Sequence, residues 1–201
     1  MSAKHFALAL SIFLAPARYS IGANLLQNPD FDGGLIGWSS PLSTATMNGG
    51  DGSPAAPSAQ LTTSSNVGVP PAELFQCVSL AGSPPPWDFG MRIRLVDSIG
   101  SGCVFQVFVE FFSGTCATST YSSYVFASAG GTVSGVQGDF TQYSAAQIVD
   151  PQPGGAASQS ASLWVIAQCG GSSNSITLNV DNAYLASSAA TPVRLQSFDI
   201  K

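Results

Sequence analysis

The chain has 201 residues, of which 45% are hydrophobic and only 8% are charged, with six Lys and Arg against 11 Asp and Glu. This length suits one domain, and 21 glycines with 13 prolines indicate a turn-rich, all-β body rather than a helical one. The formal net charge is −5 and no cluster of Lys or Arg is present, so the sequence excludes nucleic acid as a partner.

The first 23 residues have the pattern of a secretory signal peptide. Lys4 and His5 form a short positive region, residues 6–15 are apolar, and Ala23 supplies the small residue that a signal peptidase requires. A membrane anchor or a buried first helix is the alternative, but Pro16 interrupts the segment and about ten apolar residues are too few for a span of about 20. We therefore expect residues 1–23 to be removed, no membrane span, and an extracellular or periplasmic location.

Removal of this segment leaves little charged chemistry. The cations of the mature chain would be Arg92, Arg94, Arg194 and Lys201, and the single histidine, His5, would be lost. Histidine-dependent triads, His-ligated zinc and histidine pH switches are thereby excluded. A glycoside hydrolase needs only two carboxyl groups about 5 to 9 Å apart, but no spacing in this sequence indicates such a pair. We expect no enzymatic activity.

Nine apolar segments of strand length follow one another, with turns between them and no helical period. In chain order they are Asn24–Gln27, Gln60–Thr63, Leu74–Leu80, Phe89–Val96, Val104–Phe112, Ser122–Ala127, Phe140–Val149, Ser160–Gln168 and Ile176–Ala186. Loops rich in Gly and Pro are expected at Gly49–Pro57, Gly82–Pro86 and Pro151–Gly155, because proline cannot donate to a β-ladder. The pattern predicts a two-sheet antiparallel β-sandwich over residues 24–186.

Two of these segments, Phe89–Val96 and Val104–Phe112, each alternate between a wholly apolar face and a mixed face. We expect them to form a hairpin with their apolar faces aligned. Ser160–Gln168 alternates in the same way and would present Trp164 beside them. The predicted outer face therefore carries six candidate binding residues: Arg92, Arg94, Gln106, Phe108, Glu110 and Trp164.

Aromatic rings flanked by planar hydrogen-bonding groups suit sugars, whose C–H faces stack on rings while their hydroxyls need donors and acceptors. The alternative is that Arg92, Arg94 and Glu110 form a solvated ion-pair ladder and that a loop covers the rings. The two other tryptophans, Trp38 and Trp87, are expected to be structural.

The four cysteines, Cys77, Cys103, Cys116 and Cys169, lack the CxxC spacing of zinc or redox sites. In an exported chain they indicate two disulfides, with three connectivities open. If Val104–Phe112 is one strand, Cys103 and Cys116 lie about 30 Å or more apart, whereas a disulfide needs Cα atoms within about 7 Å. If the strands that start at Cys103 and end at Cys169 are antiparallel neighbours, these two residues meet. We therefore favour Cys103 with Cys169 and Cys77 with Cys116.

Three stretches go beyond generic strand patterning. They are Asn24–Ser39 (NLLQNPDFDGGLIGWS), Leu74–Leu95 (LFQCVSLAGSPPPWDFGMRIRL) and Ile176–Leu185 (ITLNVDNAYL). Together they resemble carbohydrate-binding modules of families 4, 9 and 22. The resemblance implies a secreted jelly-roll β-sandwich without catalytic activity, which accompanies a polysaccharide-degrading enzyme or a cell-surface protein. In such modules the ligand lies across a concave sheet face lined by aromatic residues, or at the loops on the sandwich edge.

The resemblance also implies a structural calcium ion where the first strand meets the last. The matching positions are Asp32 and Asp181. Calcium takes about six to eight oxygen ligands, so backbone carbonyls or waters would complete the site. The alternative is that Asp32 is a turn residue before Gly33 and that Asp181 accepts a hydrogen bond from a neighbouring backbone amide.

We expect, in sum, a secreted, non-catalytic protein that binds a neutral polysaccharide. The alternative is a structural or adhesive module of the cell envelope without sugar specificity, in contact with an envelope protein or an enzyme. Residues 187–201 resemble a short linker followed by an alternating segment, which would pack as an extra strand or lead to a partner.

Overall fold

The computed structural model describes residues 22–42, 44–66, 68–116, 121–128, 137–151 and 157–188. Most of the expected signal peptide, most of the Pro151–Gly155 loop and the tail beyond residue 188 lie outside these ranges. None of the described residues forms a helix long and apolar enough to cross a membrane.

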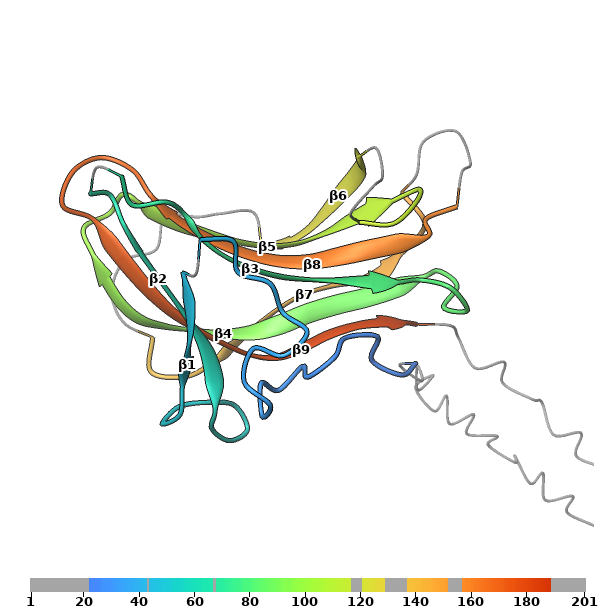
Figure 1. The fold of residues 1–201 in the computed structure, drawn as a ribbon, viewed down its shortest axis with the longest axis horizontal. Coiled ribbons are helices and arrows are strands. Elements are labelled where there is room, and N and C mark those ends of the chain that lie inside the picture. Colours follow the sequence, from blue (N-terminus) through green and yellow to red (C-terminus); the bar gives the residue numbers. More distant parts are fainter. Residues whose placement is uncertain are drawn as a thin grey trace, which may run out of the picture.

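The described part of the chain contains nine strands. They are β1 (Ala45–Asn48), β2 (Ser58–Ser64), β3 (Ala72–Ser79), β4 (Trp87–Ile99), β5 (Cys103–Phe112), β6 (Tyr121–Ser128), β7 (Thr141–Ile148), β8 (Ser160–Cys169) and β9 (Ser175–Ser187). They form a five-stranded sheet of order β1-β2-β9-β4-β7 and a four-stranded sheet of order β3-β8-β5-β6, which are stacked face to face (Figure 1). All pairings are antiparallel, which confirms the predicted two-sheet β-sandwich of the jelly-roll type.

The core lies between the two sheets and is built by strict alternation along the strands. From β4 it receives Phe89, Met91, Ile93 and Leu95, and from β5 it receives Phe105, Val107, Val109 and Phe111, all of them buried. Trp87 is also buried, lies 5.2 Å from the ring of Phe111, and donates a 2.8 Å hydrogen bond to the carbonyl of Ser83. Trp38 is buried against Phe31, so both tryptophans are structural, as expected.

The hairpin predicted from Phe89–Val96 and Val104–Phe112 is wrong. β4 pairs with β7 and β9, whereas β5 pairs with β6 and β8, so the two strands belong to opposite sheets. The chain passes between the sheets after β4, through Gly100 at a φ of 76°, a conformation that glycine adopts without strain. The apolar face of a strand is buried equally well whether the next strand pairs with it in the same sheet or packs against it from the facing sheet. Alternation therefore fixed which side chains point inward but not which strand they meet.

The segment Asn24–Gln27 is not a strand, although it runs beside the second half of β9. Leu25 donates a 2.8 Å backbone hydrogen bond to Leu185. The next hydrogen bonds to β9 come from the Asn24 side chain. Its Nδ2 donates to the carbonyl of Ala183 at 2.9 Å, and its Oδ1 accepts from the N–H of Leu185 at 3.1 Å. A side chain here replaces backbone groups, which interrupts regular pairing. The short β1, whose four residues show no clear alternation, was not predicted.

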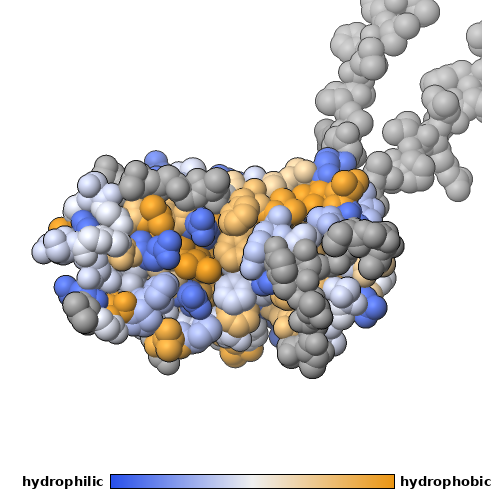
Figure 2. Space-filling view, turned by 90° about the horizontal axis from the view of Figure 1, so that it is seen from above, coloured by the Kyte–Doolittle hydropathy of each residue, from blue (hydrophilic) through white to orange (hydrophobic). Residues whose placement is uncertain are grey.

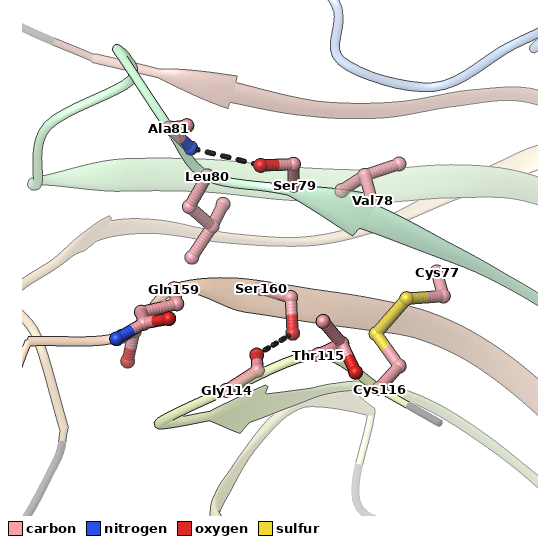
Figure 3. Close-up of a pocket in the computed structure, with 11 residues that line it drawn as sticks. Cys77, Val78, Ser79, Leu80, Ala81, Gly114, Thr115, Cys116, Gln159 and Ser160 are labelled. Atoms are coloured by element: carbon pink, nitrogen blue, oxygen red, sulfur yellow. Dashed lines mark hydrogen bonds between the residues drawn. A yellow bond between two sulfur atoms is a disulfide. The ribbon is translucent and has the colours of Figure 1, made fainter. Parts of the chain in front are cut away.

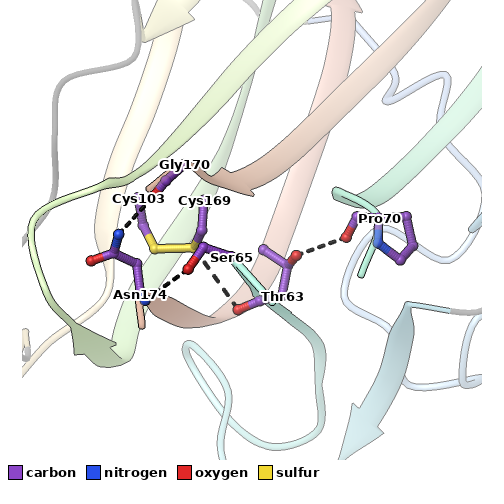
Figure 4. The surroundings of a disulfide bond; sticks show 7 residues. All are labelled: Thr63, Ser65, Pro70, Cys103, Cys169, Gly170 and Asn174. Atoms are coloured by element: carbon purple, nitrogen blue, oxygen red, sulfur yellow. Dashed lines mark hydrogen bonds between the residues drawn. A yellow bond between two sulfur atoms is a disulfide. The ribbon is translucent and has the colours of Figure 1, made fainter. Parts of the chain in front are cut away.

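Both disulfides form in the pairing favoured from the sequence. Cys103, the first residue of β5, lies opposite Cys169, the last residue of β8, with a Cα–Cα distance of 4.0 Å (Figure 4). Cys77 on β3 reaches Cys116, beyond the end of β5, with a Cα–Cα distance of 6.1 Å. Since β8 lies between β3 and β5, this second disulfide spans β8.

Loss of the disulfide across β8 should destabilise the fold. We expect the double substitution Cys77→Ala and Cys116→Ala to lower the free energy of unfolding by about 2–4 kcal/mol. Without the disulfide the loop is no longer closed, so the unfolded chain gains conformational freedom. Urea denaturation measures this loss, and peptide mapping without reductant should recover both disulfide-linked pairs in the unaltered protein. Recovery of Cys103 linked to Cys116 would contradict the strand order of the four-stranded sheet.

Candidate functional site

The six candidate binding residues lie on two opposite faces of the sandwich rather than on one. Arg92 and Arg94 project from β4 on the outer side of the five-stranded sheet. The other four project from the outer side of the four-stranded sheet. They are Gln106, Phe108 and Glu110 on β5 and Trp164 on β8. This division follows from the placement of β4 and β5 in different sheets. It also excludes the ion-pair ladder between the two arginines and Glu110.

Five aromatic side chains form a row across the outer face of the four-stranded sheet. In this aromatic row, the order of strands places Phe75 (β3) beside Trp164 (β8), then Phe108 (β5), then Tyr124 and Phe126 (β6). The ring centroids of Phe75 and Trp164 lie 4.0 Å apart, and those of Trp164 and Phe108 lie 6.0 Å apart. Phe108 in turn lies 5.5 Å from Tyr124 and 5.4 Å from Phe126.

The rings of the aromatic row differ in what they offer to a ligand. Trp164 is half-buried, because the rings of Phe75 and Phe108 lie on either side of it within 20° and 4° of parallel. A sugar between two rings would need about 7–8 Å, so none fits between Trp164 and Phe108. Phe108 is 7% exposed, whereas Tyr124 and Phe126 are each 46% exposed. The open part of the row therefore lies on β6.

The face that carries the aromatic row is concave. Figure 1 shows that the four-stranded sheet is curved, with both of its ends raised above its middle on the outer side of the sandwich. Irregularities in the β5–β6 pairing at Val107/Phe108 and at Phe111/Phe112 add to the local twist. Figure 2 looks onto this face and shows hydrophobic residues gathered along it, with hydrophilic residues interspersed.

Two polar side chains of β5 flank the aromatic row. Glu110 lies beside Tyr124 in the register of β6 and beside Ser162 in that of β8, and it is half-buried. This burial raises the pKa of the Glu110 carboxyl above its ordinary value. Gln106, also half-buried, lies beside Ile166 on the other side of the row. A carboxyl group and a carboxamide next to exposed rings supply hydrogen-bond partners for hydroxyl groups.

The sequence did not indicate three members of the aromatic row, namely Phe75, Tyr124 and Phe126. Tyr124 and Phe126 are two residues apart on one strand, so alternation placed them on a common face without saying which face of which sheet. Only the pairing of β3 and β6 with β8 and β5 brings these rings together. Trp164 and Phe108 do lie side by side, as the alternation of their strands suggested.

The Cys77–Cys116 disulfide borders the aromatic row on one side. Cys77 follows Phe75 by two residues on β3, about 7 Å along the strand. Beyond the disulfide lies a cavity of about 530 Å³, shown in Figure 3, between the end of β3, the start of β8 and the segment after β5. Leu80 lies on one side of this cavity, and Gly114 and Ser160 lie on the other (Figure 3).

The two predicted calcium ligands are brought to one cavity of about 410 Å³, together with a third carboxylate, Asp30. Asp181 is 1% exposed and accepts hydrogen bonds from the backbone N–H groups of Ser53 at 2.5 Å and Asn182 at 2.7 Å. Burial raises the pKa of Asp181 to about 6, although these two hydrogen bonds act to lower it. The nearby charges of Asp30 and Asp32 add to the rise. Among the described residues, no group of three or more Asp, Glu, His or Cys side chains is arranged to hold a metal ion.

Comparison with solved structures finds this fold among carbohydrate-binding modules. A family 61 module in complex with β-1,4-galactotriose matches with a TM-score of 0.53 and 14% identity, over 82% of this chain and 98% of the module. A family 28 module, specific for non-crystalline cellulose, matches with a TM-score of 0.52 and 13% identity, over 85% of this chain and 99% of the module.

A third match is part of a larger enzyme, the endo-1,4-β-D-xylanase 10B of Clostridium thermocellum, whose modules were solved with xylohexaose. It has a TM-score of 0.52 and 13% identity, over 85% of this chain and 29% of the xylanase chain. No family model matches the sequence. No curated protein matches it either. The likeness seen in the sequence is thus confirmed at the level of the fold.

The different exposure of the rings predicts different costs of removing them. Tyr124→Ala should lower the free energy of unfolding by about 1 kcal/mol or less, since the ring is half in solvent. Phe108→Ala should cost about 2 kcal/mol or more, because its neighbours cover it on all sides. Urea denaturation of the two variants separates these values. Equal losses would mean that the β6 rings are packed rather than open.

Proposed function

We propose that the protein is a secreted, non-catalytic module that binds a neutral polysaccharide along the aromatic row. The observation that carries this proposal is the exposure of Tyr124 and Phe126 on a concave face, next to the half-buried Glu110. Adjacent exposed rings on a protein surface indicate an interaction site. Sugar C–H faces stack on the two rings, and the Glu110 carboxyl group accepts hydrogen bonds from adjacent hydroxyls.

The length of the row favours a polysaccharide over a monosaccharide. It crosses four adjacent strands, which span about 14 Å at about 4.8 Å between neighbours. A glycan that stacks on the open rings of β6 and continues across the sheet would therefore extend over more than one sugar unit. The fold neighbours support the ligand class, since the structures above are described with galactotriose, xylohexaose or cellulose, all of them neutral glycans.

The two disulfides support secretion. Disulfides persist in oxidising compartments and are rare in the cytosol, and all four cysteines of this chain are paired. They also hold the strands beneath the aromatic row in place. A rigid face binds with a smaller loss of side-chain and backbone freedom.

Affinity electrophoresis against neutral glycans tests the proposed function. We expect galactan, xylan or non-crystalline cellulose to retard the protein, and Tyr124→Ala combined with Phe126→Ala to weaken binding about tenfold or more, because each ring contributes about 1 kcal/mol or more. Asp97→Asn, on the exposed part of β4 in the opposite sheet, is the matched control and should bind like the unaltered protein. Unchanged mobility on every glycan would instead favour a structural or adhesive envelope module.

We also propose that a calcium ion binds between Asp32 and Asp181, with backbone carbonyls or waters as its other oxygen ligands. The burial of Asp181 beside the charges of Asp30 and Asp32 supports the proposal, because a bound cation would offset their mutual repulsion. Each Asp181 oxygen that accepts an amide hydrogen bond keeps a second lone pair for a cation. Bound calcium would connect the segment after Pro29 to β9 and thereby stabilise the sandwich.

Differential scanning calorimetry tests the calcium proposal. We expect millimolar calcium to raise the melting temperature relative to the protein in chelator, because a ligand that binds only the folded state stabilises it. Asp32→Asn should abolish that increase. Asp97→Asn, on the exposed part of β4, is the matched control and should retain it. A melting temperature that is the same with calcium and with chelator would refute the site.

A further inference from the structure

A third cavity lies on the outer side of the five-stranded sheet, opposite the aromatic row. Its volume is about 410 Å³, within the range of about 300–1,000 Å³ that is usual for small-molecule sites. Three segments line it, namely residues 51–54 between β1 and β2, Arg92 and Arg94 on β4, and residues 138–140 before β7. The two arginines predicted to belong to a binding face thus line a site of their own.

Arg94 is held in place at the wall of this cavity. Its guanidinium forms an ion pair with Asp51, which also accepts a hydrogen bond from the Asn179 side chain. Its Cζ atom lies 5.7 Å from the centre of the Phe140 ring. The Nε atom is buried and has no hydrogen-bond partner within the described part of the chain. The side chain as a whole is 28% exposed, so the outer part of its guanidinium, rather than Nε, faces the cavity.

Arg92 carries a charge that no carboxylate matches at close range. It donates a hydrogen bond to the hydroxyl of Ser53 and forms no ion pair with any described residue. Asp181 lies opposite it on β9, but its carboxylate is directed to the backbone N–H groups of Ser53 and Asn182 and forms no ion pair with Arg92. The half-buried guanidinium is therefore positioned by Ser53 and has donors left for a ligand.

The remaining lining residues define the other parts of the ligand. Asp51 and Asp139 offer carboxylate oxygens that accept from hydroxyl groups, and the Phe140 ring offers an apolar surface for C–H groups. A neutral sugar would leave the charge of Arg92 unmatched. A phosphate would bring close to two negative charges beside two carboxylates. A single carboxylate fits best, since guanidinium groups bind carboxylates in a planar, two-bond geometry.

We propose that this cavity binds a carboxylate-bearing sugar, of the hexuronic acid type. The carboxylate lies against Arg92, beside the exposed part of the Arg94 guanidinium, the hydroxyls face Asp51 and Asp139, and one face of the sugar ring lies on Phe140. The acidic charge of the whole chain restricts the ligand to one or a few acidic units, because a longer polyanion would be repelled outside the cavity. The site is separate from the aromatic row and does not depend on the function proposed there.

Isothermal titration calorimetry of the full chain with digalacturonic acid tests the proposal, with the neutral digalactose as the comparison. We expect the acidic disaccharide to bind about tenfold more tightly than the neutral one, and high salt to weaken it. Arg92→Gln should weaken this binding about tenfold or more, as expected for the loss of a charge-assisted hydrogen bond. Tyr124→Ala, on the opposite face, should leave it unchanged.

Asp139→Asn provides an independent arm that leaves both arginines intact. It removes a negative charge from the lining, so it should tighten the binding of digalacturonic acid. The proposal is overturned if the acidic disaccharide does not bind, if both disaccharides bind equally, or if Arg92→Gln has no effect in a protein with an unchanged melting temperature. If Arg92→Gln does not fold, Asp139→Asn decides, and unchanged or weaker binding overturns the proposal.

Discussion

Burial of two apolar sheet faces against each other is the constraint on which the rest of this structure depends. Phe89 to Leu95 on β4 and Phe105 to Phe111 on β5 supply opposite halves of one core, with every second side chain at or near zero exposure. Once these side chains point inward, their neighbours must point outward, on two faces that lie back to back. Outward-pointing residues of β4 and β5 can thus lie on opposite faces of the sandwich, far apart in space. Arg92 and Phe108 are such a pair.

The strand β8 holds a central place in the four-stranded sheet. It pairs with β3 on one side and with β5 on the other, and it carries Trp164 at the middle of the aromatic row. One disulfide joins its last residue to β5, and the other passes across it from β3 to Cys116. The sheet beneath the aromatic row is therefore cross-linked near both ends of β8. The rings thus keep their arrangement without a ligand.

The sequence predicted the position of most strands, the orientation of their side chains, and both disulfides, because alternation and cysteine geometry are local properties. Apart from the pairing of β5 with β8, on which the cysteine argument depended, it did not predict which strand lies beside which. That information resides in contacts such as Phe75 with Trp164, whose residues are 89 positions apart by number and share no local pattern. For the same reason Asp30 was missed beside Asp32, since only the fold of the loop over β9 reveals that both carboxylates face Asp181.

The burial of the three tryptophans has an optical consequence. Trp38 and Trp87 are buried away from the aromatic row, so a glycan on that row does not touch their indoles. Trp164 alone stands on an outer face, between two phenyl rings and with an indole N–H that has no partner among the described residues. The intrinsic fluorescence of this chain therefore contains a constant background from two emitters and a signal from one, and that one is located where the proposed glycan would lie.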